Sequence, residues 1–275
     1  MQDKMFSNWN GRITPAAAAP SASVDAFRLR YGLYETYLCR NGSIEYASLH
    51  WQRMREGLKV LGFSVPAAFS ENYLYDQMLA TIAACGLADL CRIRVQIYTD
   101  SETAPFEPQW IIEVFPLAVS MTQWLSAGIR LAVLDDFVRD NDATANFKIS
   151  HNRHFLPARA AVEAGVADDV LLRNAAGNLV ESAIANLFWI KDGCVFTPPL
   201  SEGCLAGTIR KLIIDRLQEH GIPLSEQPAT DMDLLYADEI FLSNGIRKIR
   251  WVREFNRRIY DSGFTRRLCD LLFGE

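Results

Sequence analysis

The sequence lacks the signatures of several large function classes. Its 275 residues contain no CxxC pair, no HExxH segment, no GxGxxG and no Walker loop, so neither a zinc site nor a glycine-rich nucleotide loop is indicated. No apolar run is long enough to span a bilayer, and the start, MQDKMFSNWNG, has no signal-peptide core. The net charge of −5 does not indicate a basic surface for binding nucleic acid. We therefore expect a cytoplasmic protein with no metal, membrane or nucleic-acid partner.

Lysine is also scarce. Of the 28 basic residues only six are lysines: Lys4, Lys59, Lys148, Lys191, Lys211 and Lys248. Arginine offers a planar fork that fits carboxylate and phosphate, whereas lysine is the residue that can become a nucleophile. The arginine surplus therefore fits anionic small-molecule ligands, although genome composition alone can produce the same bias. The six cysteines lie in apolar runs and are expected to be reduced core residues.

The residues that are present predict two domains. A chain of this length with 49% hydrophobic residues can bury a large core, in one large domain or two smaller ones. Pro116 ends a strand-like run, and the stretch after it resembles a connection. We expect an N-terminal α/β domain at residues 1–116, a linker at 117–126 and a C-terminal α/β domain at 127–275.

Hydrophobic periodicity predicts a mixture of helices and strands. Asn-Gly pairs indicate hairpin turns at residues 10–11 and 41–42. The predicted helices cover residues 48–61, 73–85, 153–164 and 208–220. The predicted strands cover residues 92–98, 110–115, 129–134, 170–173, 179–190, 194–197 and 237–243. The fold class is α/β (α+β), with much antiparallel sheet in the second half.

Lys148 is the first candidate for chemistry. It lies in ATANFKISHN, between a predicted strand and a predicted helix, in a neighbourhood poor in charge. Desolvation disfavours an ammonium, so a partly buried lysine becomes available as an amine. A lysine that extends into solvent is the commoner case for an isolated example. The motifs that follow Lys148 therefore decide its role.

Several ordered motifs follow Lys148 along the chain: Ala167-Asp-Asp-Val-Leu-Leu, Gly177-Asn-Leu-Val-Glu181, Asn186-Leu-Phe188, Thr197-Pro and Leu205-Ala-Gly-Thr-Ile-Arg210. This run resembles the class IV aminotransferases, which comprise transaminases for branched-chain and D-amino acids and aminodeoxychorismate lyase. The match is dense between Lys148 and Arg210 and looser elsewhere. The resemblance implies the fold-type IV architecture: two domains, each with antiparallel or mixed sheet and flanking helices, with pyridoxal 5'-phosphate at the domain interface.

The resemblance also assigns roles to residues. Lys148 would hold the cofactor as a Schiff base and carry the proton between substrate and cofactor. Glu181 would pair with the pyridine nitrogen and keep it protonated, which makes the ring an electron sink. Leu205 would pack on the ring. The phosphate would bind the start of a helix at Thr208 and Ile209, together with Arg53 of the HxxR segment at His50.

Three segments depart from the family pattern. The family order Gly-Ile-Thr is Gly-Thr-Ile here, so the backbone amides remain while the hydroxyl at Thr208 is displaced. Arg153 replaces a tyrosine near the cofactor 3'-oxygen in branched-chain enzymes, where it either stabilises a phenolate or starts a helix in solvent. Ser243 and Asn244 stand where many relatives have Ser-Gly-Thr, and are expected to make polar contacts to the phosphate side.

The substrate is predicted from the arginines of the first domain. Arg28 and Arg30 occupy a segment that faces the active site in relatives, and Arg92 and Arg94 share one face of a strand. Arg30 and Arg92 together suit a carboxylate clamp, as in bacterial D-amino-acid transaminases with arginines at these two places. We therefore expect D-glutamate or D-alanine as donor, and 2-oxoglutarate or pyruvate as acceptor. Structural ion pairs are the alternative for Arg28, Arg30 and Arg94.

Other functions compatible with the sequence remain open. Aminodeoxychorismate lyase uses the same lysine to eliminate pyruvate, and Asn152-Arg153 with Ala185-Asn-Leu-Phe-Trp189 look similar to that enzyme. A branched-chain L-amino-acid transaminase is disfavoured because its apolar substrate would desolvate the arginines. A non-catalytic protein of this fold is disfavoured by Lys148 and Glu181. The resemblance further implies a homodimer with shared active sites.

Overall fold

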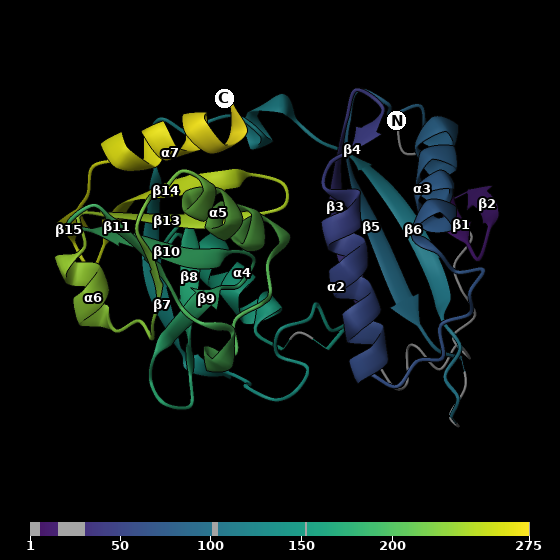
Figure 1. Cartoon of the computed structure of the whole chain (residues 1–275), viewed down its shortest axis with the longest axis horizontal. Coiled ribbons are helices and arrows are strands. Elements are labelled where there is room, and N and C mark those ends of the chain that lie inside the picture. The colour runs from purple at the N-terminus through teal and green to yellow at the C-terminus, as the bar shows by residue number, and fades with distance from the viewer. Residues whose placement is uncertain (1–5, 16–30, 101–103, 152, 275) are drawn as a thin grey trace. The chain divides into compact units, whose positions relative to one another are not determined.

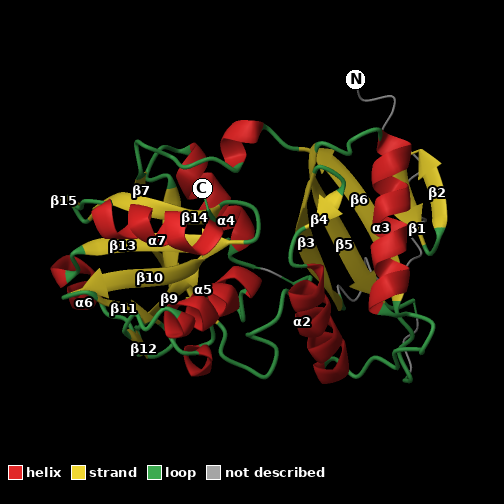
Figure 2. Cartoon of the chain, turned by 45° about the horizontal axis from the view of Figure 1, so that its top comes forward, coloured by secondary structure: helices red, strands yellow, loops and turns green. Residues whose placement is uncertain are grey.

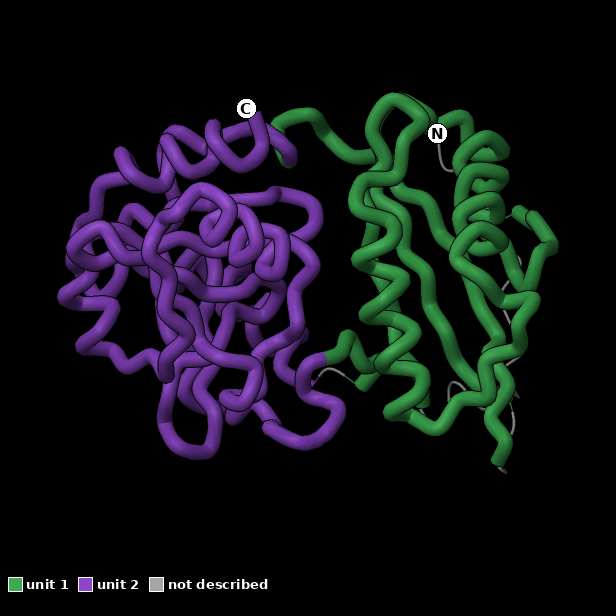
Figure 3. Tube along the Cα trace, viewed as in Figure 1, with its two compact units in different colours: residues 1–121, 147–151 green, residues 122–146, 152–275 purple. Residues whose placement is uncertain are grey.

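The computed structural model in Figure 1 describes residues 6–15, 31–100, 104–151 and 153–274. The chain forms two compact units, coloured separately in Figure 3: Met1–Met121 with Phe147–His151, and Thr122–Asn146 with Asn152–Glu275. The division after Met121 falls inside the stretch predicted as a linker. The predicted boundary differs at one place, because residues 147–151, including Lys148, belong to unit 1 and not to the second half.

Unit 1 contains a six-stranded sheet in the order β2-β1-β6-β5-β3-β4. Its strands are β1 (Phe6–Trp9), β2 (Arg12–Pro15), β3 (Gly32–Arg40), β4 (Ser43–Ile44), β5 (Leu90–Tyr98) and β6 (Gln109–Pro116). All neighbouring pairs are antiparallel. Both predicted hairpins are confirmed, because Asn10 and Asn41 adopt the positive φ angles that their turns require.

The helices α2 (Ala47–Val60) and α3 (Glu71–Cys85) lie along one face of this sheet (Figure 1). Both confirm predicted helices. Ser70 caps α3 by accepting a hydrogen bond from the Tyr73 backbone, and Gly86 ends it with φ 66°, a conformation that favours glycine. Alternate residues of β3 and β5 are buried beneath these helices, so the other residues of each strand form the opposite face.

Unit 2 contains nine strands. They are β7 (Ile129–Arg139), β8 (Asp169–Asn174), β9 (Leu179–Ser182), β10 (Asn186–Lys191), β11 (Cys194–Thr197), β12 (Leu224–Glu226), β13 (Glu239–Asn244), β14 (Lys248–Phe255) and β15 (Arg258–Ile259). Because β9 pairs with both β8 and β10, the strands β10-β13-β14-β7-β8-β9 form a closed ring. The predicted long strand at 179–190 is interrupted at residues 183–185, where the chain turns from β9 into β10.

The helices of unit 2 are shown in red in Figure 2. They are α4 (Phe155–Glu163), α5 (Thr208–Glu219), α6 (Asp231–Tyr236) and α7 (Gly263–Phe273). The described residues also contain the 3-10 turns η2 (Val119–Met121) and η3 (Leu200–Glu202). The helices α4 and α5 confirm predictions, whereas α6, α7, β12, β14 and β15 were not predicted. In the described part of the chain, no helix has the length and apolarity needed to cross a membrane.

The fold-type IV class predicted from the motifs is confirmed by this mixture of sheets and flanking helices and by the related structures reported below. The core of unit 2 gathers apolar side chains from the ring strands, among them Leu131, Leu171, Leu187, Leu242 and Val252. The core of unit 1 lies between its sheet and the helices α2 and α3. Each unit therefore has a core of its own.

Candidate active site

Lys148 lies in a short segment, residues 147–151, which we call the lysine strap; the Ile149 amide donates to the Phe147 carbonyl at 3.0 Å, so the strap turns at Lys148. The strap pairs with the start of β3: the Tyr34 amide donates to the Lys148 carbonyl at 2.8 Å, and the Ser150 amide donates to the Gly32 carbonyl at 3.0 Å. Phe147 packs at Gly57 of α2, where a Cβ would lie 2.8–3.2 Å from neighbouring side chains. The position of Lys148 on unit 1 is therefore fixed by backbone hydrogen bonds on one side and packing on the other.

The Lys148 ammonium meets polar and aromatic groups of β3. Its Nζ lies 5.0 Å from the centre of the Tyr34 ring and donates a long hydrogen bond of 3.5 Å to Thr36 Oγ1. Tyr34 and Thr36 are two apart on one strand, so they share a face of the sheet. The lysine is half-buried, which agrees with the partly buried amine expected from the sequence.

Arg94 joins the same face from β5. It is paired with Thr36 across the strands, its guanidinium carbon lies 4.4 Å from the centre of the Tyr34 ring, and its Nη2 donates to Gln96 Oε1 at 3.0 Å. Lys148 and Arg94 therefore contact the same aromatic ring. Cations over a ring face are stabilised by its quadrupole, so Tyr34 holds two positive groups near one another.

Of the two predicted clamp partners, the structure describes only Arg92. Arg92 is exposed on the same strand face, with its guanidinium carbon 4.7 Å from the centre of the Phe115 ring. Arg28 and Arg30 lie outside the described residues. Within the described ranges, Arg94, whose role the sequence left open, is the arginine of this set that lies beside Lys148 at the Tyr34 ring.

Arg53 takes part in a buried polar cluster of unit 1. Its Nε and Nη2 donate to the two oxygens of Glu35 at 2.7 and 2.6 Å, and His50 Nδ1 lies 2.7 Å from Glu35 Oε2. All three side chains are buried. Burial acts to raise the pKa of Glu35, but the Arg53 guanidinium and His50 outweigh it and hold the pKa well below its ordinary value. Burial lowers the pKa of His50, so His50 is neutral at pH 7 and its Nδ1 carries the proton.

This cluster gives a prediction about stability. Glu35→Gln leaves the buried Arg53 charge without its carboxylate, and we expect the free energy of unfolding at pH 7 to fall by about 3 kcal/mol. Because the folded pKa is depressed, the contribution of Glu35 is complete above its unfolded pKa of about 4.3 and is lost as the pH falls through the folded value.

Urea unfolding at pH 7 and pH 3 measures this contribution. The difference in the free energy of unfolding between wild type and Glu35→Gln should be smaller at pH 3 than at pH 7. The exposed Glu56→Gln on the same unit serves as control. An equal gap at both pH values would contradict the depressed pKa.

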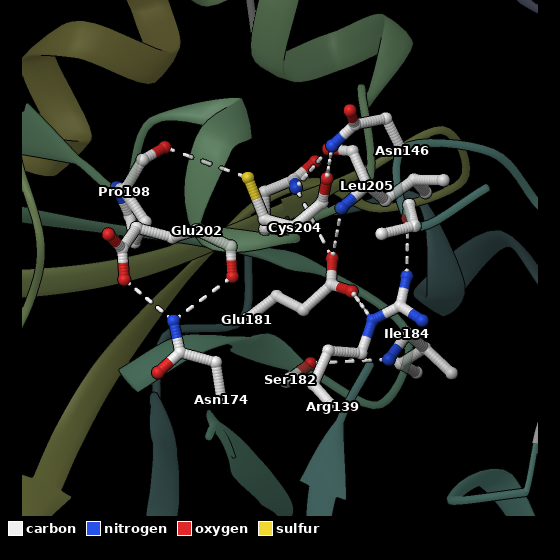
Figure 4. Close-up of polar contacts among 12 residues, drawn as sticks. Arg139, Asn146, Asn174, Glu181, Ser182, Ile184, Pro198, Glu202, Cys204 and Leu205 are labelled. Atoms are coloured by element: carbon white, nitrogen blue, oxygen red, sulfur yellow. Dashed lines mark hydrogen bonds and ion pairs between the residues drawn. The ribbon is translucent and has the colours of Figure 1, made fainter. Parts of the chain in front are cut away.

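Glu181 lies at the centre of a second buried cluster, in unit 2 (Figure 4). Its Oε1 accepts from Arg139 Nε at 2.9 Å, and its Oε2 accepts from the Leu205 amide at 2.9 Å. Arg139 Nη2 also donates to the Ala145 carbonyl at 2.6 Å. The side chains of Glu181 and Arg139 are only 7% and 15% exposed, so this carboxylate is ion-paired and oriented in a largely buried place. Sequence reasoning did not identify Arg139.

Asn186 and Ser243 extend this cluster across the sheet. Glu181 is paired with Asn186, and Asn186 with Ser243, so the three lie in a row on neighbouring strands. Asn186 Nδ2 donates to the Leu205 carbonyl at 2.8 Å. A Cβ at Gly207 would come within 1.9 Å of Asn186 Oδ1, so only glycine allows the start of α5 to approach the row this closely.

The N-terminus of α5 brings anion-binding groups to this row. Gly207 is the N-cap, and Thr208 and Ile209 are the first helical residues and are buried. Their amides and the positive end of the helix dipole suit a phosphate. Ser243 Oγ is buried and has no hydrogen-bond partner among the described residues, which is the state of a hydroxyl that a bound ligand satisfies. The residues present therefore fit a phosphorylated pyridine cofactor.

Two predicted contacts look different in the structure. Asn244 Oδ1 accepts from the Ile246 and Arg247 amides at 3.0 and 2.9 Å, so this oxygen is used to shape the turn after β13. Arg153 Nη2 donates to Asp140 at 2.7 and 3.0 Å, and the two side chains are 59% and 60% exposed. This is the geometry of the second alternative for Arg153, a solvent-facing residue next to the start of α4.

In the described ranges, no group of three His, Cys, Asp or Glu side chains is arranged to hold a metal ion. Each unit carries groups of a kind used by one class of enzyme, the lysine in unit 1 and the carboxylate and helix start in unit 2. A half-buried lysine, a buried arginine-paired carboxylate and a helix start fitted to phosphate are the parts of an enzyme that binds pyridoxal phosphate.

Comparison with known proteins agrees with this class. Residues 32–255 match the family model described as amino-transferase class IV. The aminodeoxychorismate lyase of Vibrio harveyi is 25% identical over 227 residues, covering 80% of this chain and 82% of that protein. The branched-chain-amino-acid aminotransferase of Pseudomonas aeruginosa is 28% identical over 223 residues, covering 78% and 71%. The crystal structure of a branched-chain aminotransferase from Thermoproteus uzoniensis superposes with a TM-score of 0.85 at 24% identity, covering 97% and 92%.

The chain belongs to the class IV aminotransferase family. It is accordingly a pyridoxal-phosphate-dependent aminotransferase by family. The relatives reported above are named for branched-chain amino acids or aminodeoxychorismate, so they lend no support to the expected preference for D-amino acids.

Proposed function

We propose that this aminotransferase exchanges amino groups between D-amino acids and 2-oxo acids, with D-glutamate and 2-oxoglutarate as the favoured amino-acid and oxo-acid pair, so that D-alanine and 2-oxoglutarate give pyruvate and D-glutamate. The observation that carries the proposal is the sheet face of unit 1, where Arg94 and Lys148 contact the same Tyr34 ring and Arg92 lies two residues from Arg94. Three positive groups on one face favour a substrate that carries more than one carboxylate.

Pyridoxal phosphate, when bound, supplies an aldehyde for amines and a ring that accepts electrons from the substrate Cα. The Lys148 Nζ binds the cofactor between turnovers and, once displaced by the amino substrate, moves a proton at the substrate Cα. Thr36 Oγ1 and the Tyr34 ring orient this amine. Because the strap is fixed by backbone hydrogen bonds, the amine is positioned before the substrate arrives.

We assign the remaining cofactor contacts to unit 2 and to Arg53. Glu181, ion-paired with Arg139, would keep a proton on the pyridine nitrogen. The amides of Thr208 and Ile209 and the hydroxyl of Ser243 receive the phosphate. Leu205, fixed through its backbone to Glu181 and Asn186, packs on the ring. Arg53 is the second phosphate ligand, and its ion pair with Glu35 fixes the plane of its guanidinium.

The substrate assignment is tested on Arg94. Arg94→Ala removes a charge-assisted hydrogen bond to a carboxylate, worth about 1.5–3 kcal/mol, and we expect the KM for 2-oxoglutarate to rise by about 10- to 100-fold. Steady-state kinetics of D-alanine with 2-oxoglutarate, and of D-glutamate with pyruvate in the reverse direction, measure the change. The exposed Arg55→Ala on α2 is the matched control. An unchanged KM in Arg94→Ala would remove the basis of the dicarboxylate assignment.

The hand of the substrate is tested in the same assay with D- and L-forms of glutamate, alanine and leucine. The D-handed proposal is based on the pair Arg30 and Arg92, which together would hold the α-carboxylate. We expect D-glutamate to be turned over and L-leucine not to be. Turnover of L-leucine or L-isoleucine alone would replace the proposal by a branched-chain function, as in the Pseudomonas aeruginosa relative.

A second candidate is supported by the Vibrio harveyi relative, which aligns with 80% of this chain and is named as a lyase. An aminodeoxychorismate lyase would release pyruvate from aminodeoxychorismate without any amino acceptor, since elimination needs no second substrate. We expect no release above background. Release at the rate of amino transfer would favour the lyase.

A further inference from the structure

Gln96 of β5 links the arginine of the proposed substrate face to the lysine strap. Its Oε1 accepts from Arg94 Nη2 at 3.0 Å. Its Nε2 donates to Ser150 Oγ of the strap at 2.6 Å and lies within hydrogen-bond distance of the carbonyls of Leu33, at 3.1 Å, and Ile97, at 3.3 Å. One carboxamide therefore contacts two strands, the strap and the arginine.

The chemistry of its partners fixes the orientation of this carboxamide. Arg94 can only donate, and the carbonyls of Leu33 and Ile97 can only accept. Rotating the amide by a half turn would place NH₂ against the guanidinium and the oxygen against two carbonyls. Gln96 therefore has one allowed orientation. A side chain held in this way fixes the positions of its partners relative to one another.

Ser150 connects Gln96 to the reactive amine. The Ser150 amide donates to the Gly32 carbonyl while its hydroxyl accepts from Gln96, so both ends of the residue are held. Lys148 and Ser150 are two apart in the strap, and each makes a backbone hydrogen bond to the start of β3. The strap is therefore located on β3 by its backbone and on β5 by Gln96.

We infer that Gln96 is a positioning residue that couples the carboxylate-binding arginine to the lysine strap. This inference builds on the proposed function, because it takes Arg94 as the group that binds a substrate carboxylate. Gln96 restrains Arg94 without neutralising it, which leaves the positive charge available to the substrate. It also ties Ser150 to the same point, so the arginine and the amine keep a constant spacing.

Gln96→Glu tests the coupling. A carboxylate at this position would form an ion pair with Arg94 and compete with the substrate, and it would present an oxygen to the Leu33 and Ile97 carbonyls. We expect the KM for 2-oxoglutarate to rise by about tenfold or more. We also expect the pH midpoint of the visible absorbance band of the bound cofactor to shift, because the strap moves. The exposed Gln52→Glu makes the same charge change on unit 1 and serves as control.

Ser150→Ala cuts only the link to the strap. It should move the absorbance midpoint and lower kcat while leaving the KM for 2-oxoglutarate unchanged, and Ser150→Thr, which keeps the hydroxyl, should restore both. The inference is overturned if Gln96→Glu and Gln52→Glu have the same KM for 2-oxoglutarate. It is also overturned if the pH midpoint of the cofactor absorbance band is the same in Ser150→Ala as in wild type. A loss of thermal stability without these changes would mean a structural role only. If Arg94→Ala itself leaves KM unchanged, the proposed function fails instead.

Discussion

Lys148→Ala is expected to abolish amino transfer, with kcat reduced by roughly 10³-fold or more. The variant loses the amine that holds the cofactor and moves the proton at the substrate Cα. The fold should survive, because the strap is held by the backbone hydrogen bonds of Tyr34 and Ser150 and by Phe147. The variant also loses one of the two cations at the Tyr34 ring, where Arg94 remains. We therefore expect activity to be lost while the free energy of unfolding stays close to that of wild type.

Borohydride reduction followed by peptide mapping measures this directly. In wild type the cofactor label should appear on the peptide that contains Lys148, and in Lys148→Ala it should be absent. Lys59→Ala, an exposed lysine on α2, is the matched control and should keep both label and activity. A label on another lysine in the wild-type protein would refute the assignment of Lys148.

The sequence predicted those elements of the fold that carry a local signal. The Asn-Gly turns, the helix ending at Gly86 and the alternating strands β5 and β6 are fixed by turn chemistry and side-chain period, and the structure confirms them. The break between β9 and β10 was not predicted, because apolar residues continue through 183–185 and give no turn signal. The closure of the ring is a pairing between strands, and no single segment encodes it.

The lysine strap shows a second feature that the sequence alone could not predict, the unit to which a segment belongs. Its residues follow β7 in sequence and precede α4, so linear reading assigns them to the second half. They belong to unit 1 because of pairing with β3, more than 110 residues earlier in the chain. Long-range pairing of this kind depends on the register of both segments, which periodicity does not define.

The site residues that lie within sequence motifs could be predicted. The residues that contact them from distant parts of the chain could not. Lys148 and Glu181 were proposed from ordered motifs. Arg139 was missed because it is 42 residues from Glu181 and lies at the end of a strand with a register shift. Arg94 was left open because alternation places Arg92 and Arg94 on the same face equally well, and only the position of Tyr34 distinguishes them.

Glu181→Gln is expected to lower kcat by about 10²- to 10³-fold, the usual cost of removing one fixed electrostatic contact from a reaction centre. Glutamine keeps the size of the side chain, and its oxygen can still accept from the Leu205 amide. It cannot hold a proton on the pyridine nitrogen, and it leaves Arg139 beside a neutral group. Glu163→Gln is the control, since Glu163 is also paired with an arginine but at the surface, with 63% exposure.

Separate measurements of cofactor binding and of hydrogen exchange at the substrate Cα distinguish an effect of Glu181→Gln on binding from an effect on the reaction. The dissociation constant of the cofactor should change much less than kcat in Glu181→Gln, because the phosphate contacts at Thr208, Ile209 and Ser243 are on other residues. The exchange of the substrate Cα hydrogen with solvent should slow in parallel with kcat, since both need the ring to accept electrons. If exchange kept its wild-type rate, the charge of Glu181 would not act on the ring, and Arg139 would then serve only to compensate a buried carboxylate.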